Sequence, residues 1–337
     1  MQEKPLLEIT ELKTHFRAES GYVTAVDGIS FQIKKGEILG VVGESGCGKS
    51  VTAESILRLH DEHNTKYEGK INLNGDNILN FSKTKMQNIR GNEISMIFQD
   101  PMSSLNPVYT IGNQIMEAIL LHQDITKKEA YDKALEILKL TGIPAPEKRI
   151  TEYPHELSGG MQQRVMIAIG LACQPKLLIA DEPTTALDVT IQAQILELIL
   201  HLNNELSMGV VFITHDLGVV AEICDRVVVM YLGQIVEEAD TETLFDEPLH
   251  PYTAGLLKSI PKMDGDRTEK LHVVKGNVPS LDSIPSGCRF ASRCPYADEL
   301  CRKKMPELKS YDNGMKVRCW HTERIQHEEE RDYVATD

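Results

Sequence analysis

The chain of 337 residues is long enough for two domains, at roughly 100–200 residues per domain. Its composition, with 41% hydrophobic and 26% charged residues, is that of a globular protein and excludes a disordered one. The net charge of −14 opposes binding to nucleic acids, whose phosphates carry the same sign. No apolar run reaches the roughly 18 residues of a membrane-spanning helix, and the start MQEKPLLEIT lacks the layout of a secretion signal. We therefore expect a soluble, cytosolic protein.

The first 245 residues alternate short apolar runs with longer helical patterns. Such short runs are typical of strands that are covered on both faces, as in a parallel α/β sheet. They are residues 38–42 (ILGVV), 177–180 (LLIA), 210–214 (VVFIT) and 227–230 (VVVM). Helical periodicity marks residues 127–140 and 191–206, and residues 69–77 (GKINLNGDN) indicate an antiparallel element that ends in a turn.

The character of the chain changes near residues 245–260. Beyond this point prolines interrupt any long helix, and four of the seven cysteines are clustered there. We predict a cassette over residues 1–250, a small irregular Cys-rich module over 251–325 and a polar tail over 326–337.

A phosphate-binding loop follows the first apolar run. Residues 43–50 (GESGCGKS) match the pattern G-x-x-x-x-G-K-[ST], between a predicted strand and a predicted helix. The glycines let backbone N–H groups surround phosphates, Lys49 reaches the terminal phosphates, and the Ser50 hydroxyl binds magnesium. A chance glycine-rich turn is the alternative, but the flanking elements disfavour it. The predicted nucleotide contacts are Gly43, Glu44, Ser45, Gly46, Cys47, Gly48, Lys49, Ser50 and Val51.

Further motifs narrow the class of nucleotide-binding protein. The run LLIADE ends in Asp181, which can hold magnesium, and Glu182, which can polarise a water molecule. The segment LSGGMQ opens a helical stretch at Ser158, and taken alone it reads as an ordinary capped helix start. Taken alone, His215 in ITHD is a core histidine and Gln99 in IFQDP is a loop glutamine.

Together these motifs resemble the ATP-binding subunits of ABC transporters. The P-loop, Gln99, LSGGMQ, LLIADE, ALD and His215 occur in the order of that family, over roughly residues 8–245. The resemblance implies a P-loop ATPase fold with a RecA-like core, an antiparallel β subdomain and a helical signature subdomain.

The resemblance also implies roles for the matching residues. Two subunits would pack head to tail, and each ATP would lie between one P-loop and the partner's Ser158, Gly159 and Gly160. Glu182 would be the catalytic base, Gln99 would contact magnesium and the membrane partner, and His215 would hold the γ-phosphate. Magnesium would be held by Ser50, Gln99 and Asp181. Phe16, with Tyr22 as the alternative, is the aromatic residue expected to stack on adenine, unless each is simply a core residue.

Longer segments are similar to the oligopeptide and dipeptide importers, a group that includes nickel importers. These segments are residues 97–107, 153–168, 179–196 and 250–261. This resemblance implies an ATPase that drives peptide import, at the cytoplasmic face of the membrane and peripheral to it. Its implied partners are a second ATPase, expected to be a paralogue that forms a heterodimer, two permease subunits and an extracellular peptide-binding protein.

The clustered cysteines predict a metal site, because a reducing cytosol disfavours a disulfide framework. Four thiolates suit zinc or an iron–sulfur cluster. The spacing lacks the paired short gaps of structural zinc sites, which favours a [4Fe–4S] cluster, and the resemblance implies the same group. Zinc, or four thiols without metal, are the alternatives. The predicted ligands are Cys288, Cys294, Cys301 and Cys319.

Two other functions remain as alternatives to a transporter ATPase. One is an ABC ATPase acting on DNA or ribosomes, which the single cassette and the charge of −14 disfavour. The other is a regulatory module that binds ATP without turnover, which the presence of Glu182 and His215 disfavours.

Overall fold

The fold was analysed on a computed structural model of the whole chain. The structure describes residues 4–19, 21–100, 104–185, 187–260 and 273–323, so the predicted tail over 326–337 lies outside the described residues. Within these ranges the chain forms two compact units. The first contains residues of 1–8, 32–38 and 71–213, and the second contains residues of 9–31, 39–70 and 214–337.

The first unit is built on parallel strands. β6 (Ile94–Ile97) pairs with β7 (Leu177–Asp181), and β7 pairs with β8 (Gly209–Thr214). Every residue of these strands is buried, which is why their sequences are continuous apolar runs. Helix α8 (Val189–Leu206) begins at Asp188, whose side chain accepts a hydrogen bond from the Ile191 N–H. The strands and the helix predicted here are confirmed.

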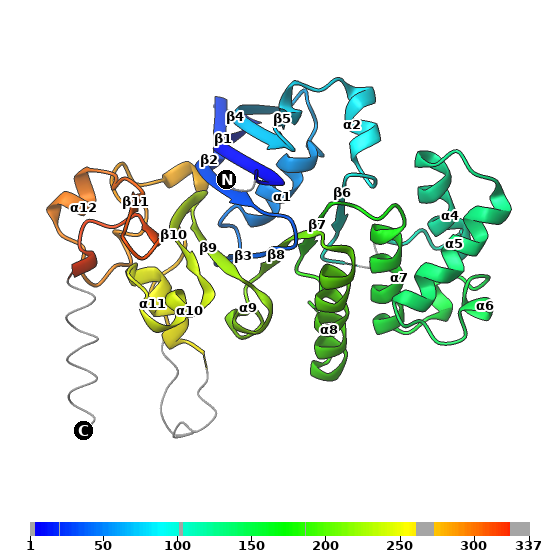
Figure 1. Ribbon diagram of the computed structural model, residues 1–337. Coiled ribbons are helices and arrows are strands. Elements are labelled where there is room, and N and C mark those ends of the chain that lie inside the picture. The colour runs from blue at the N-terminus through cyan, green and yellow to red at the C-terminus, as the bar shows by residue number, and fades with distance from the viewer. Residues whose placement is uncertain (1–3, 20, 101–103, 186, 261–272, 324–337) are drawn as a thin grey trace, which may run out of the picture. The chain divides into compact units, whose positions relative to one another are not determined.

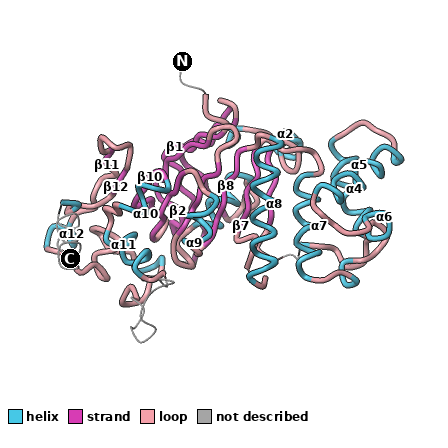
Figure 2. The backbone as a smooth tube through the Cα atoms, turned by 60° about the horizontal axis from the view of Figure 1, so that its bottom comes forward, coloured by secondary structure: helices cyan, strands magenta, loops and turns pink. Residues whose placement is uncertain are grey.

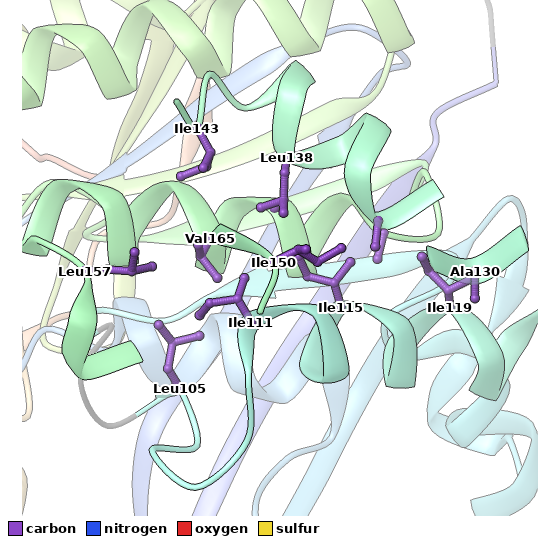
Figure 3. Packing of buried hydrophobic residues seen from close by; sticks show 13 residues of the cluster. Leu105, Ile111, Ile115, Ile119, Ala130, Leu138, Ile143, Ile150, Leu157 and Val165 are labelled. Carbon is purple, nitrogen blue, oxygen red and sulfur yellow. The ribbon is translucent and has the colours of Figure 1, made fainter. Parts of the chain in front are cut away.

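Three helices of the first unit share a hydrophobic core: α4 (Ile111–His122), α5 (Lys127–Leu140) and α7 (Gly159–Leu171). The short helix α6 (Pro146–Arg149) lies between α5 and α7 in the chain, and Ile150 after it joins this core. Figure 3 shows side chains of this region gathered in one cluster. Helix α5 has the predicted bounds because Thr126 and Glu129 form a capping box at its start. This is the helical part of the predicted cassette.

Short elements complete the first unit. Strand β5 (Asp76–Asn77) pairs antiparallel with the end of β4 (Thr65–Leu73), as the turn residues of 69–77 predict. A 3-10 turn η1 (Ile78–Asn80) and helix α2 (Lys83–Ile89) follow. A second 3-10 turn, η2 (Pro154–Glu156), precedes α7.

In the second unit β3 (Ile38–Val42) pairs parallel to β9 (Arg226–Tyr231), and β10 (Gln234–Asp240) pairs antiparallel to β9. Helix α1 (Lys49–Leu57) follows β3, and α9 (Leu217–Ile223) precedes β9. Strands β2 (Gly21–Ile33), β1 (Leu7–Ala18) and β4 neighbour each other in that order. The predicted β subdomain is therefore present.

The C-terminal part of the second unit joins the same sheet. Helices α10 (Thr241–Asp246) and α11 (Pro251–Lys258) are followed by η3 (Leu281–Ser283) and α12 (Glu299–Lys303). Strand β12 (Lys316–Val317) pairs with β10 and with β11 (Lys309–Ser310) (Figure 1). Loops connect α12, β11 and β12, as Figure 2 shows. The domain ranges 1–250 and 251–325 stay predictions. No helix among the described residues is long and apolar enough to span a membrane.

The helical core of the first unit yields a stability prediction. Leu138 on α5 is fully buried, so Leu138→Ala should lower the free energy of unfolding by about 2–5 kcal/mol. Leu121 on α4 is 76% exposed, so Leu121→Ala is the matched control and should change it by less than about 0.5 kcal/mol. Urea unfolding of both variants measures the difference, and equal effects would contradict this core.

Candidate nucleotide and metal sites

The P-loop conformation depends on glycines at positions of close approach. Gly43 has φ +149°, and a Cβ there would lie 2.3 Å from the Met230 carbonyl oxygen. Gly48, with φ +103°, is the N-cap of α1, and its Cβ would lie 3.0 Å from the Ala25 carbonyl oxygen. A side chain at Gly43 would displace strand β9 or the loop itself. The backbone therefore keeps the tight turn that a phosphate-binding loop needs.

Lys49 is buried beneath this loop at the start of α1. Its Nζ donates to the Gly43 carbonyl at 2.7 Å and to the Glu44 carbonyl at 3.2 Å. The ammonium group is thus held at the loop by backbone carbonyls, which suits it to an incoming phosphate. Ser45, Gly46 and Ser50 are exposed and lie on the accessible side of the loop.

The P-loop cysteine, Cys47, lies in an environment that disfavours its thiolate form. It occupies a variable position of the motif, and its side chain is buried. Burial raises the pKa of its thiol, and the nearby Lys49 charge only partly opposes this effect. The thiolate is the reactive form, so Cys47 is both shielded and protonated near neutral pH. Burial and the raised pKa both lower the reactivity of this thiol toward alkylating reagents.

The acidic end of β7 holds two carboxylates in different environments. Asp181 is the last residue of the strand and is buried. Glu182 follows in a left-handed conformation, with φ +47°, and its N–H donates to the Ile213 carbonyl at 2.9 Å. Its Oε2 accepts hydrogen bonds from Gln99 Nε2 and from Thr185 Oγ1, each at 3.0 Å. The sequence marks Gln99 and Glu182 separately, whereas the structure brings them into contact.

Helix α7 begins at Ser158 without a side-chain cap. The Ser158 side chain makes no capping hydrogen bond in the described structure, whereas Thr110, Thr126 and Asp188 cap their own helices. Ser158 is the N-cap residue of α7, as an ordinary helix start in LSGGMQ predicts, but the capping hydrogen bond expected from its side chain is not made. A Cβ on Gly159 would meet nothing within 4 Å. The first turn of α7 is thus open to a group from outside the chain.

A Cβ on Gly160, by contrast, would lie 2.8 Å from Ile191 Cγ2, so this glycine is required by packing.

The remaining predicted nucleotide contacts lie in the second unit. His215 is exposed in the turn after β8, and Asp216 next to it caps α9. Phe16 on β1 is half-buried, with its ring edge to face with His60 at 4.8 Å between centroids. Tyr22 at the start of β2 is exposed. The P-loop belongs to this unit too, while Gln99, Asp181, Glu182 and the LSGGMQ segment belong to the first.

The four C-terminal cysteines share one neighbourhood. Burial, and to a smaller extent the nearby Cys319, Cys288 and Cys301 thiols, raise the pKa of the Cys294 thiol to about 12. Burial likewise raises the pKa of Cys319 to about 11. The Cys288 N–H donates to the Cys301 carbonyl at 2.7 Å. These mutual effects place the four thiols in one region of the C-terminal segment, where a bound cation would favour their thiolate forms.

Gly287 fixes this arrangement, since a Cβ there would lie 2.3 Å from the Cys301 carbonyl oxygen.

Two further metal-ligand candidates were not identified from the sequence. Ligand atoms of Asp298, Cys301 and His321 lie within 4.8 Å of one another. His321 Nε2 lies 2.8 Å from Asp298 Oδ2, and the His321 N–H donates to Cys319 Sγ at 3.3 Å. The position of His321 two residues after Cys319 is the sequence signal that points to it.

The sequence matches two protein families and several known proteins. Residues 26–185 match the family described as "ABC transporter", and residues 236–301 match "Oligopeptide/dipeptide transporter, C-terminal region". The chain is 52% identical to the "Probable peptide ABC transporter ATP-binding protein y4tR" of Sinorhizobium fredii, covering 96% of this chain and 98% of that one. It is 54% identical to the "Oligopeptide transport ATP-binding protein AppD" of Bacillus subtilis, over 94% and 96% of the two chains.

Solved structures agree with this assignment. A dimeric bacterial ABC transporter cassette, MJ0796, matches with a TM-score of 0.62 and 28% identity, over 70% of this chain and 98% of that one. The same cassette bound to ADP and Pi after hydrolysis matches with a TM-score of 0.63. The chain therefore belongs to the ABC transporter family. Within that family it is an ATP-binding subunit of the oligopeptide and dipeptide transporters, and an ABC-type ATPase.

Proposed function

We propose that this chain hydrolyses ATP to drive import of oligopeptides or dipeptides, with Glu182 as the general base. The observation that carries this assignment is the Glu182 carboxylate, held by Gln99 and Thr185 beside the buried Asp181. Both of these donors are neutral, and together they orient the Glu182 carboxylate. A carboxylate so positioned can accept a proton from an attacking water.

The P-loop residues would bind the phosphates. Lys49 would leave its contact with the Gly43 carbonyl for a phosphate oxygen, and Ser50 with Asp181 would hold magnesium. Magnesium, when bound, neutralises charge on the phosphates. Gln99 would contribute its amide oxygen to the metal, since its Nε2 already donates to Glu182. His215 would hold the γ-phosphate, and Phe16 or Tyr22 would stack on adenine.

The signature segment would complete the site of a second ATPase subunit. The uncapped N-terminus of α7 supports this, because its N–H groups and helix dipole favour an anion. The match to a cassette solved as a dimer supports it as well. The partner would be a paralogue, giving a heterodimer with two composite ATP sites.

Membrane partners would convert ATP hydrolysis into transport. The match of residues 236–301 to the C-terminal region of oligopeptide/dipeptide transporters supports two permease subunits and an extracellular peptide-binding protein. Curated relatives named for peptide and dipeptide transport support the cargo class. The chain would then sit peripherally at the cytoplasmic face of the membrane.

The cysteine-containing segment would bind a [4Fe–4S] cluster through Cys288, Cys294, Cys301 and Cys319. The mutual effects of these thiols on one another's pKa support a shared site. The His321 N–H, which donates to Cys319 Sγ, is a contact that stabilises a metal-bound thiolate. A bound cluster would cross-link the segment from Cys288 to Cys319. We propose a structural role for it, because ATP hydrolysis requires no electron transfer. Zinc held by Asp298, Cys301 and His321 is the alternative that the geometry offers.

The assignment of Glu182 is tested by Glu182→Gln. This change should preserve ATP binding and slow hydrolysis by the assembled complex about 100-fold or more, because a positioned base is lost. Glu197→Gln, at an exposed position of α8, is the matched control and should keep the normal rate. Lys49→Ala should instead weaken ATP binding itself. Near-normal turnover by Glu182→Gln would remove Glu182 from this role.

The two-subunit site is tested by Gly159→Glu. Because a side chain here meets no atom of its own chain within 4 Å, the isolated variant should fold and bind ATP as before. The added bulk and negative charge should block closure on the partner's ATP, reducing ATPase activity of the assembled complex at least tenfold, or about 1.4 kcal/mol. Calorimetry of the isolated chain and turnover of the complex separate the two effects. Normal turnover by the complex would show that α7 does not face the partner's nucleotide.

The cluster is tested by metal analysis of protein purified without oxygen. It should be brown and carry about four irons per chain. Serine at Cys288, Cys294, Cys301 or Cys319 should lower the iron content, while serine at Cys173 or Cys224, which lie elsewhere, should not. Stoichiometric zinc without iron would overturn the cluster. Loss of that zinc in His321→Ala would then assign it to the Asp298, Cys301 and His321 set.

A further inference from the structure

An ion pair joins the cysteine-containing segment to the P-loop. The Arg293 guanidinium donates to both carboxylate oxygens of Glu44, from Nη1 to Oε2 at 2.5 Å and from Nη2 to Oε1 at 2.9 Å. Glu44 is the second residue of the P-loop, and Arg293 directly precedes Cys294. This two-pronged geometry is the strongest form of an arginine–carboxylate contact.

Arg293 is held in place on every side. Its Nε donates to the Lys275 carbonyl at 3.1 Å, and its Nη2 donates to the Val274 carbonyl at 3.1 Å. Its Cζ lies 5.8 Å from the ring centroid of Tyr231 and 5.9 Å from that of Phe290. The side chain is only 3% exposed. The Glu44 side chain is 30% exposed, so the pair joins a buried arginine to a partly exposed P-loop carboxylate.

A second contact reaches the backbone of the same P-loop residue. The Tyr252 hydroxyl accepts a hydrogen bond from the Glu44 N–H at 2.8 Å. Tyr252 on α11 is fully buried and packs against Tyr231 and Phe290. Both the side chain and the N–H of Glu44 are thus fixed from the C-terminal segment, which sets the path of the loop between Gly43 and Lys49.

The turn that places Arg293 also places Cys294. The N–H groups of Arg293 and Cys294 both donate to the Phe290 carbonyl, at 2.9 Å and 3.0 Å. A ligand that holds the Cys294 sulfur therefore fixes the turn from which the Arg293 side chain extends.

We propose that Arg293 is a positioning residue of the nucleotide site, acting through Glu44, and that this contact makes ATP affinity depend on the cysteine cluster. The first part rests on the proposed phosphate-binding role of the P-loop, and the second on the proposed cluster. With the cysteines bound to metal, the loop is preorganised for phosphate. When the metal is lost, the 290–294 turn loosens, and ATP must order the loop as it binds.

The pair is tested by titrating Mg·ATP into the isolated full chain. Arg293→Met and Glu44→Gln should each raise the dissociation constant about tenfold, as loss of a charge-assisted contact does. The double variant should be no weaker than the weaker single variant, because both changes break one pair. Arg293→Lys keeps the positive charge but loses the two-pronged contact with Glu44, so its dissociation constant should lie between those of the wild type and Arg293→Met. Arg302→Met, at an exposed position of α12, is the matched control.

Glu44→Gln separates positioning from damage to the C-terminal segment, because Glu44 lies outside it. In the assembled complex KM for ATP should rise while kcat changes less than about twofold. An Arg293→Met dissociation constant within twofold of the Arg302→Met value would overturn the positioning role. If the double variant raised the dissociation constant by the product of the two single effects, the Arg293 and Glu44 side chains would act independently, and their proposed joint role would be wrong.

The dependence on the cluster is tested by Cys294→Ser. It should raise the dissociation constant about tenfold in the wild-type background and should have no further effect in Arg293→Met. A Cys294→Ser protein that loses iron but keeps its ATP affinity would overturn the coupling and leave the cluster in place. Wild-type protein without any bound metal would overturn the cluster, while the Arg293 and Glu44 variants would still decide the positioning role.

Discussion

The constraint on which the structure depends is the backbone path of the P-loop. Its N–H groups can face phosphates only if the loop turns tightly, and this brings Gly43 against the Met230 carbonyl. The turn between β9 and β10 also supports the loop, because the Gly233 N–H donates to the Cys47 carbonyl at 2.8 Å. The neighbouring strand β9, the loop glycines and the buried Lys49 together hold the P-loop in this tight turn.

Buried charge is balanced where the C-terminal segment meets the rest of the second unit. In a chain with a net charge of −14, Arg289 pairs with Asp27 and donates to the Leu232 carbonyl, and Arg293 pairs with Glu44. A buried arginine without such partners would be strongly destabilising. These contacts bind the segment to the nucleotide-binding loop, so a C-terminal segment of irregular structure has a defined position.

The C-terminal cysteines and the Glu182 carboxylate have different electrostatic environments. Burial and mutual repulsion raise the pKa of the thiols, so in the absence of a cation they remain protonated. Glu182 is instead oriented by hydrogen bonds from Gln99 and Thr185. Burial therefore acts on the thiols, whereas directed hydrogen bonds act on the carboxylate.

The sequence by itself determined the elements whose signals are local. Helix α5 and strand β3 have their predicted bounds, since a capping box and a short apolar run are decided by neighbouring residues. The P-loop, the acidic end of β7 and the signature segment were found in the same way, as short ordered motifs. Tertiary structure decided the rest: the burial of Cys47, the contact of Gln99 with Glu182 and the ion pair of Arg293 with Glu44. The residues of these two contacts are 83 and 249 positions apart, so no local pattern encodes them, and only the folded chain brings them together.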